Sequence, residues 1–177
     1  MASILLIVDM QTTLINDNPY GKETLITNIS QLIAAARKKG VEIGHVQHDG
    51  GKGDELEKGT AGWEICPALA PSPGEMVLEK HLNSAFKNTA MHDYLQSREI
   101  KTIILAGMQT EYCIDATCRS AFDLGYSVII PQGSTSTFDN EYMTGEKTIA
   151  YYEKKIWNNR FASVPPVSAV IEAWAVG

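Results

Sequence analysis

Three residues that can do chemistry, Asp9, Lys80 and Cys113, each lie at or shortly after the end of a short apolar run of the chain. A carboxylate can accept a proton, an ammonium group can balance and orient a carboxylate, and a thiol becomes a strong nucleophile once it loses its proton. If the apolar runs are neighbouring parallel strands, the residues that follow them meet at one edge of a sheet. The combination predicts a cysteine nucleophile with Asp9 as its base.

Each of the three residues also has an ordinary role. An aspartate after a strand often caps a loop or a helix, a lysine at that place is usually solvated, and a cysteine in a helix is often a small buried apolar residue. The hypothesis of a shared site therefore depends on their joint placement rather than on any one of them.

Cys113 is expected in the first turn of a helix that Thr110 caps. Unpaired N–H groups and the helix dipole at that position favour a thiolate and can stabilise an oxyanion. Cys113 and Arg119 also match the C-x5-R spacing of cysteine phosphatases. The residues between them contain no glycine and include Asp115, whose charge would oppose a bound phosphate, so this alternative is disfavoured.

Short apolar runs alternate with amphipathic stretches, and this alternation predicts the elements that position the three residues. Strands are expected at 4–8, 41–47, 76–79, 102–106, 127–130 and 161–164, and helices at 25–39, 90–97, 112–124, 144–157 and 167–174. Parallel neighbours need crossover connections, so we expect an α/β fold with a parallel sheet covered by helices on both faces. The glycine- and proline-rich stretch 49–74 is too long for an ordinary connection and is expected to be a lid or a binding loop.

The composition limits the class of protein. The chain has 177 residues, with 15 Lys and Arg against 21 Asp and Glu, and a formal net charge of −6. This length predicts one domain over residues 1–177, and the acidic balance argues against a nucleic-acid partner. The cysteines lack C-x-x-C spacing, so no disulfide framework or zinc ribbon is expected, and Cys66 and Cys118 are interpreted as structural thiols. No apolar run approaches the roughly 20 residues of a membrane span, and the expected location is the cytoplasm.

The segments around the three residues resemble the isochorismatase-like cysteine hydrolases, a family that includes nicotinamidases and N-carbamoylsarcosine amidohydrolases. The family's first strand with its acid is similar to LLIVDMQ at 5–11, its lysine segment to EKHLNSAF at 79–86, and its nucleophile segment to GMQTEYCIDATCRSAFDLGY at 107–126. The resemblance covers nearly the whole chain. It implies a three-layer α/β/α sandwich with a six-stranded, mostly parallel sheet.

The resemblance also implies roles for single residues. Cys113 would be the nucleophile, Asp9 the general base and acid, and Lys80 the third member of a triad. A cis peptide between Met108 and Gln109 would turn the Gln109 N–H into an oxyanion hole, beside the N–H of Cys113. The implied reaction is hydrolysis of an amide, carbamoyl or ureido C–N bond of a small molecule through a thioester, without a cofactor. Members usually form dimers or tetramers, so we expect a homo-oligomer.

Two alternatives stay open. Nicotinamidases hold a metal with an Asp-x-His pair after the second strand, but this region reads HVQHDG at 45–50, so no metal site is predicted. His45 and His48 should point to opposite faces of a strand, which leaves His45 packed or hydrogen-bonded. The other alternative is a non-catalytic binding protein on the same fold, which the intact set of Asp9, Lys80 and Cys113 disfavours. Isochorismatases themselves lack the cysteine and cleave a vinyl ether, so Cys113 favours the amide-hydrolase branch.

The sequence predicts the substrate pocket only in outline. Four residues are candidates for its lining, namely Gln11, His48, Trp63 and Phe86. Each has a plain alternative: a helix start for Gln11, a solvated loop for His48, a subunit contact for Trp63 and the core for Phe86. The substrate itself is not identified by these residues.

Overall fold

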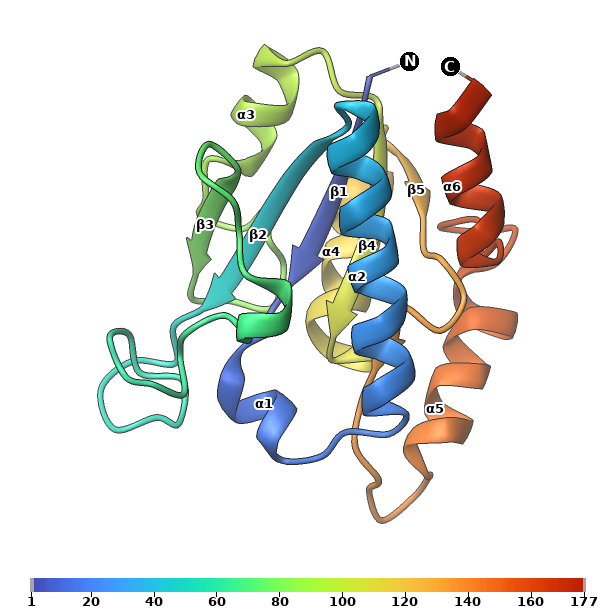
Figure 1. The fold of residues 1–177 in the computed structure, drawn as a ribbon. Helices are drawn as coiled ribbons and strands as arrows, with labels where there is room; N and C mark the ends of the chain where they lie inside the picture. Colours follow the sequence, from blue (N-terminus) through green and yellow to red (C-terminus); the bar gives the residue numbers. More distant parts are fainter. Residues whose placement is uncertain (1, 177) are drawn as a thin grey trace.

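The computed structural model describes residues 2–176 and contains one six-stranded sheet. The strands are β1 (Ser3–Val8), β2 (Glu42–His48), β3 (Met76–Lys80), β4 (Thr102–Met108), β5 (Ser127–Ile129) and β6 (Thr135–Ser136). They lie in the order β3-β2-β1-β4-β5, and β6 pairs with the end of β4. All of these pairings are parallel, and Figure 1 shows the arrowheads of β1, β2 and β4 pointing the same way.

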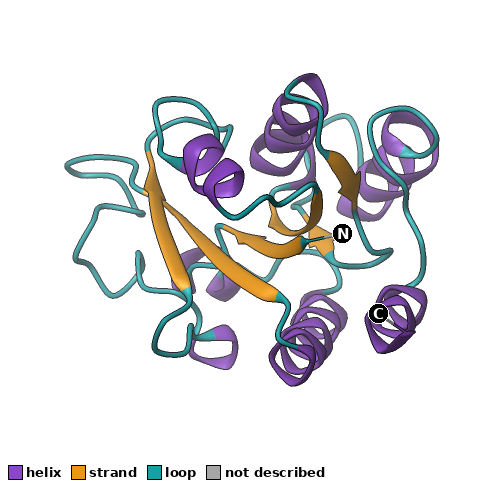
Figure 2. Ribbon diagram, turned by 90° about the horizontal axis from the view of Figure 1, so that it is seen from above, coloured by secondary structure: helices purple, strands orange, loops and turns teal. Residues whose placement is uncertain are grey.

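Helices cover both faces of the sheet, as Figure 2 shows from above. The α-helices are α1 (Thr12–Asn16), α2 (Lys22–Lys39), α3 (Met91–Ser97), α4 (Asp115–Asp123), α5 (Gly145–Tyr151) and α6 (Val167–Val176). A 3₁₀ turn, η1 (Pro67–Leu69), and two π-helical segments, η2 (Thr110–Ile114) and η3 (Tyr152–Trp157), complete the regular structure of the described residues. The predicted three-layer α/β/α class is confirmed.

Alternation along β1 creates two cores, because successive side chains of a strand point to opposite faces. Leu5 and Ile7 pack with α2 and α6 on one face. On the other face Ile4, Leu6 and Val8 pack with α3, α4 and η3. A strand buried on both faces must be apolar throughout, which explains the continuous apolar run at the start of the chain.

Three expectations about the elements need correction. Residues 161–164 do not form the sixth strand: Ser163 makes one isolated bridge with Ile129, and the two prolines that follow lack the N–H groups that a ladder needs. The sixth strand is β6, a pair of residues beside Gly107 and Met108. Helix α1 was not among the predicted helices, although a helix start was the alternative role of Gln11, and Gln11 is the N-cap residue of α1. The helix predicted at 112–124 overlaps the π-helical segment η2, and the one predicted at 144–157 contains η3.

The carboxyl ends of the strands gather the loops that position polar side chains. In Figure 1 the stretch 49–74, coloured teal to green, leaves the end of β2 and returns beside α1 before β3. Backbone contacts fix this return, since Thr12 N–H donates to the Glu64 carbonyl and Cys66 N–H to the Met10 carbonyl. Among the described residues, no helix has the length and apolar character that crossing a membrane requires.

Candidate active site

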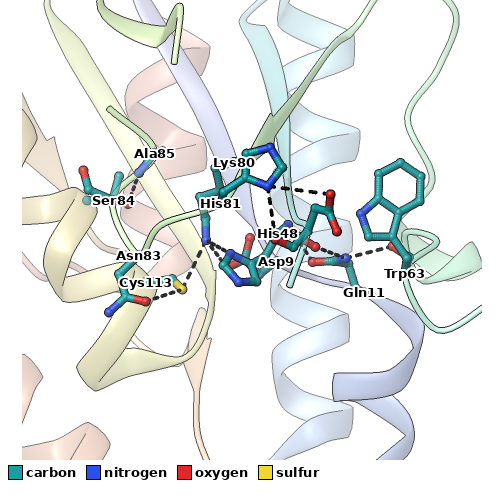
Figure 3. A network of polar contacts seen from close by, with 12 residues as sticks. Asp9, Gln11, His48, Trp63, Lys80, His81, Asn83, Ser84, Ala85 and Cys113 are labelled. Atoms are coloured by element: carbon teal, nitrogen blue, oxygen red, sulfur yellow. Dashed lines mark hydrogen bonds and ion pairs between the residues drawn. The ribbon is translucent and has the colours of Figure 1, made fainter. Parts of the chain in front are cut away.

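Lys80 is the centre of a buried polar cluster at the carboxyl edge of the sheet (Figure 3). Its Nζ lies 2.7 Å from Asp9 Oδ2, 3.2 Å from His48 Nδ1 and 3.3 Å from Cys113 Sγ. A lysine ammonium has three protons and can only donate. The three contacts therefore use all of its donors and hold the carboxylate, the imidazole and the thiol around one point.

Strand register explains why these side chains meet. Lys80 is the last residue of β3 and pairs with His48, the last residue of β2. Asp9 follows β1, between β2 and β4, and its N–H donates to the Val46 carbonyl at 2.9 Å. The backbone of Asp9 has φ 52°, a left-handed conformation that aspartate and asparagine adopt more readily than most residues. Cys113 reaches the same edge from η2, directly after β4.

Asp9 is a buried carboxylate with one unused oxygen. Its side chain is 3% exposed, and burial raises its pKa although the neighbouring Lys80 and the Cys113 thiol both act to lower it. Oδ2 is held by Lys80, whereas Oδ1 has no hydrogen-bond partner among the described residues. A raised pKa strengthens a carboxylate as a base, and the unused oxygen leaves a place for a proton.

Cys113 is a thiol in this environment, and the stabilisation of a thiolate expected from the helix start is outweighed. Burial and the nearby negative charge of Asp9 raise the pKa of the thiol to about 12, against the opposing effect of Lys80. The expected cap is also absent, because the Thr110 hydroxyl donates to the Thr135 hydroxyl at 3.1 Å and the turn that follows is π-helical. A partner that removes the proton is therefore required before Cys113 can act as a nucleophile.

Gln11 supports the site from behind rather than lining it. Its side-chain amide pairs with His48 as a strand residue would: Nε2 donates to the His48 carbonyl and Oε1 accepts from the His48 N–H, both at 2.9 Å. Nε2 also donates to the Trp63 carbonyl, so one buried amide fixes the end of β2 and the returning loop (Figure 3).

His48 faces the site as a neutral imidazole. Burial and the charge of Lys80 lower its pKa. Because Lys80 can only donate, Nδ1 of His48 must accept, and the proton of the neutral ring is on Nε2. His48 therefore fixes the position of Lys80 and retains one donor.

A pocket of about 220 Å³ opens onto this cluster. Its lining consists of Asp9, Leu14, His48, Asp54, Glu55, Leu56, Asn83, Gln109, Tyr112 and Cys113. Three of the expected pocket residues are not in that lining. Gln11 bonds to the backbone of His48, and the carbonyl of Trp63 accepts from the Gln11 amide. Phe86 stacks on Tyr126 in the core at a ring separation of 5.9 Å. An aromatic residue after a strand carries no mark in the sequence that separates a pocket wall from the core.

Sequence reasoning missed Asn83, Tyr112 and the two acidic residues Asp54 and Glu55. The Cys113 thiol lies 3.9 Å from Asn83 Oδ1. Asp54 and Glu55 come from the stretch 49–74, which the sequence does indicate as a binding loop. Tyr112 is adjacent to the thiol in sequence, and that adjacency was the available signal.

The turn before Cys113 contributes Gln109 to the lining of the pocket. The peptide bond between Met108 and Gln109 is cis, and Gln109 is part of the lining while Met108 is fully buried. Within residues 2–176 the Gln109 N–H has no hydrogen-bond acceptor.

The residues that suggested other chemistry are engaged elsewhere. Arg119 Nε pairs with Asp115 Oδ2 at 2.8 Å, as neighbours one helical turn apart, and does not form an anion-binding loop around Cys113. His45 is buried, with Nε2 3.3 Å from Glu75 Oε2, which confirms the expected packed and hydrogen-bonded role.

One group of side chains brings possible metal ligands together. The ligand atoms of Asp49, Glu79 and His81 lie within 4.8 Å of one another. Glu79 is already paired with Lys58, and His81 is exposed. The group does not include His48, and it does not provide the Asp-x-His pair of the nicotinamidase alternative.

The fold is a parallel α/β sandwich, and a carboxylate, an ammonium group and a thiol meet at the carboxyl edge of its sheet. This combination is suited to a hydrolase. The family model for the isochorismatase domain matches residues 3–154. The chain belongs to the isochorismatase family.

Individual relatives agree with this assignment. The streptothricin hydrolase of Streptomyces noursei is 31% identical over 137 residues, which cover 76% of this chain and 50% of that protein, so the match spans about half of its length. The ureidoacrylate amidohydrolase RutB of Methylorubrum extorquens is 27% identical over 171 residues, covering 75% of this chain and 69% of the relative. A crystal structure described as an isochorismatase family protein is 31% identical, with a TM-score of 0.85, over 92% of this chain and 96% of the other.

Proposed function

We propose that this chain is a cysteine-dependent hydrolase that cleaves an amide, carbamoyl or ureido C–N bond of a small molecule through a thioester. The observation that carries the proposal is the contact of Lys80 with both Asp9 and Cys113, beside an Asp9 oxygen for which the described residues offer no partner. Two relatives named as hydrolases, one of them an amidohydrolase, support the choice of reaction.

The first half of the reaction forms the thioester. Asp9 takes the thiol proton on Oδ1, and the Cys113 sulfur attacks the carbonyl carbon. Lys80 stabilises the thiolate while this happens, because it donates to the sulfur. The N–H groups of Gln109 and Cys113 receive the oxyanion, and the proton on Asp9 moves to the departing nitrogen as the C–N bond breaks.

Water completes the cycle. Asp9 removes a proton from water as the oxygen attacks the thioester carbon, and the proton returns to the sulfur as the C–S bond breaks. The acid product leaves and Cys113 is again a thiol. His48 holds Lys80 in position throughout and has its Nε2 proton available for a substrate acceptor.

The pocket volume of about 220 Å³ fits a small substrate, since pockets for drug-sized ligands are roughly 300–1,000 Å³. No step needs a metal or a cofactor. We also propose that the chain acts in the cytoplasm. We further propose that it forms a homo-oligomer, a dimer or a tetramer, and light scattering of the purified chain measures this oligomeric state.

The test is an ammonia-release screen over primary amides, carbamoyl compounds and ureides, with Cys113→Ala as the control. We expect release with at least one class, none with Cys113→Ala, and a mass increase on Cys113 when the reaction is quenched with acid. Full turnover by Cys113→Ala would overturn the mechanism. Nicotinamide is included with and without a chelator, and activity that depends on a metal would support the nicotinamidase alternative instead.

A further inference from the structure

The lining of the pocket carries an unusual balance of charge. Three carboxylates, Asp9, Asp54 and Glu55, contribute to it, and the lining includes no lysine or arginine. Lys80 is fully buried and outside the lining, and its charge is paired with that of Asp9. His48 adds no positive charge, because burial and Lys80 both lower its pKa.

The two outer carboxylates are part of a built wall of the pocket. Asp54 Oδ1 accepts the Leu56 N–H at 2.8 Å, and the side chain lies against Gly50 so closely that a Cβ there would be 2.2 Å from its carboxyl carbon. Leu56, next in the lining, is 7% exposed and anchors the loop in the core. The negative charge of Asp54 reaches the reacting centre, where it acts to raise the pKa of His48.

Other residues of the lining are neutral and polar. They include Asn83, Gln109 and Tyr112, and the ring of Tyr112 is about half exposed. An aromatic face attracts a cation, and carboxylates pair with one. An anionic group in the same place would meet the charges of Asp54 and Glu55, with no lysine or arginine in the lining to pair with it. Within the described residues the buried Asp9 Oδ1 has no hydrogen-bond partner and adds a further acceptor.

We propose that this pocket selects a substrate that carries a positively charged amine or guanidine group near the scissile C–N bond. Asp54 and Glu55 hold the cation, Tyr112 lies beside it, and the carbonyl reaches Cys113. Substrates with a carboxylate at that place are rejected by the same charges. This inference rests on the proposed function for the site but concerns its choice of substrate.

Charged thiol reagents test the inference without any knowledge of the substrate. Cys113 is allowed to react with trimethylammonium-ethyl, sulfonato-ethyl and methyl methanethiosulfonate, which are cationic, anionic and neutral. Mixed-disulfide formation is followed by intact mass, with Cys113→Ala to identify the site. Each rate is divided by the rate of the same reagent with free β-mercaptoethanol. We expect the cationic reagent to react about tenfold faster than the anionic one at low salt, and less so at high salt.

The variant Asp54→Asn/Glu55→Gln removes both charges and keeps their shape, and asparagine can still accept the Leu56 N–H. We expect it to lower the cation-to-anion ratio about tenfold, as two exposed pairs of up to about 1 kcal/mol each would. Glu64→Gln is the matched control, because Glu64 is an exposed acid of the same loop outside the pocket lining. It should leave the ratio unchanged.

The neutral reagent shows whether the variant has moved the loop. If the rate of the neutral reagent changes too, the single variant Glu55→Gln decides instead, since it leaves Asp54 and its contact with the Leu56 N–H intact. An unchanged ratio in the variant that decides, or a wild-type preference for the anion, would overturn the inference. In the ammonia-release screen, amides that end in an amine should exceed chain-matched neutral amides in kcat/KM. Ammonia release without a preference for amides that end in an amine would contradict this inference and leave the proposed function standing. A preference for the cationic reagent without ammonia release from any substrate would contradict the proposed function and leave this inference about the charge of the pocket standing.

Discussion

Cys113 and Cys118 are two thiols of one helical segment that share almost every local property. Burial and a neighbouring carboxylate raise the pKa of each thiol to about 12, and a neighbouring cation opposes the shift in each. Asp9 and Lys80 are those neighbours for Cys113. For Cys118 they are Asp115 and Arg119.

The difference lies in what the carboxylate already holds. Both oxygens of Asp115 are occupied, one by Arg119 Nε at 2.8 Å and the other by Trp157 Nε1 at 2.9 Å. Asp9 Oδ1 has no hydrogen-bond partner within residues 2–176, and Cys113 faces a pocket whereas Cys118 is fully buried in the core. Thiol pKa alone therefore does not distinguish a nucleophile from a structural cysteine. A free acceptor and access to a ligand do.

Replacing each thiol by alanine gives the largest contrast. Cys113→Ala should lower kcat/KM on an identified amide by on the order of 10⁴-fold or more, because the proposed nucleophile is lost. Cys118→Ala should retain activity within about threefold, since it touches no reacting atom. Steady-state kinetics on the two variants check this. Comparable losses would break the comparison.

Asp9→Asn should make Cys113 as unreactive as Cys118. Asparagine keeps the left-handed backbone and the shape but cannot take the proton, so we expect activity to fall by roughly 10²–10⁴-fold. In the wild type, burial raises the folded-state pKa of Asp9 above 3.8. The working carboxylate is therefore lost as the pH falls through that raised value, and kcat/KM should decline on the acid side at a higher pH than an exposed aspartate would impose. A wild-type acid limb at or below the pH expected of an exposed aspartate would contradict this assignment.

His48 should matter through Lys80. His48→Leu removes an acceptor of the ammonium group, and we expect a loss of about tenfold, as for one hydrogen bond to a charged group. His48→Gln can accept again through its amide oxygen and should recover part of the activity. A purely structural role predicts equal stability losses and no recovery, so thermal melts are measured beside the kinetics.

Substitution of Cys118 should cost more stability than substitution of Cys113, the reverse of the order expected for activity. Cys118→Ser places a hydroxyl in a fully buried apolar position and should cost about 1–3 kcal/mol of unfolding free energy. Cys113→Ser, in a polar and partly open site, should cost less than about 1 kcal/mol. Urea denaturation of both variants measures the difference, and equal costs would show that the two environments are closer than their contacts indicate.

More of the fold than of the candidate site could be predicted from the sequence. Continuous apolar runs and helical spacing predicted five of the six strands and the long helices, because burial on two faces imposes a pattern that can be read locally. The end of α2 at Lys39 followed by Gly40 was equally readable. Residues 161–164 were wrongly predicted as a strand. They are apolar enough for one, but two prolines follow them, and only one bridge to Ile129 of β5 forms.

The pocket depends on contacts between distant segments, and these leave little mark in the chain. Gln11, Trp63 and Phe86 have the right residue types but face His48, the loop backbone and Tyr126. Asp54 and Glu55 belong to no sequence motif that would mark them as pocket residues. Their place in the lining follows from how a long loop returns to the sheet, which no periodicity encodes.

Gly107 shows how a residue without any chemistry can limit what this protein tolerates. At φ 126°, it lies against β1 so closely that a Cβ would be 2.0 Å from the Val8 carbonyl oxygen. In a library of random variants this position should accept no replacement, although Gly107 is not part of the pocket lining. A selection for activity would then score Gly107 beside Cys113, and only a parallel assay of soluble yield would tell the backbone requirement from the catalytic one.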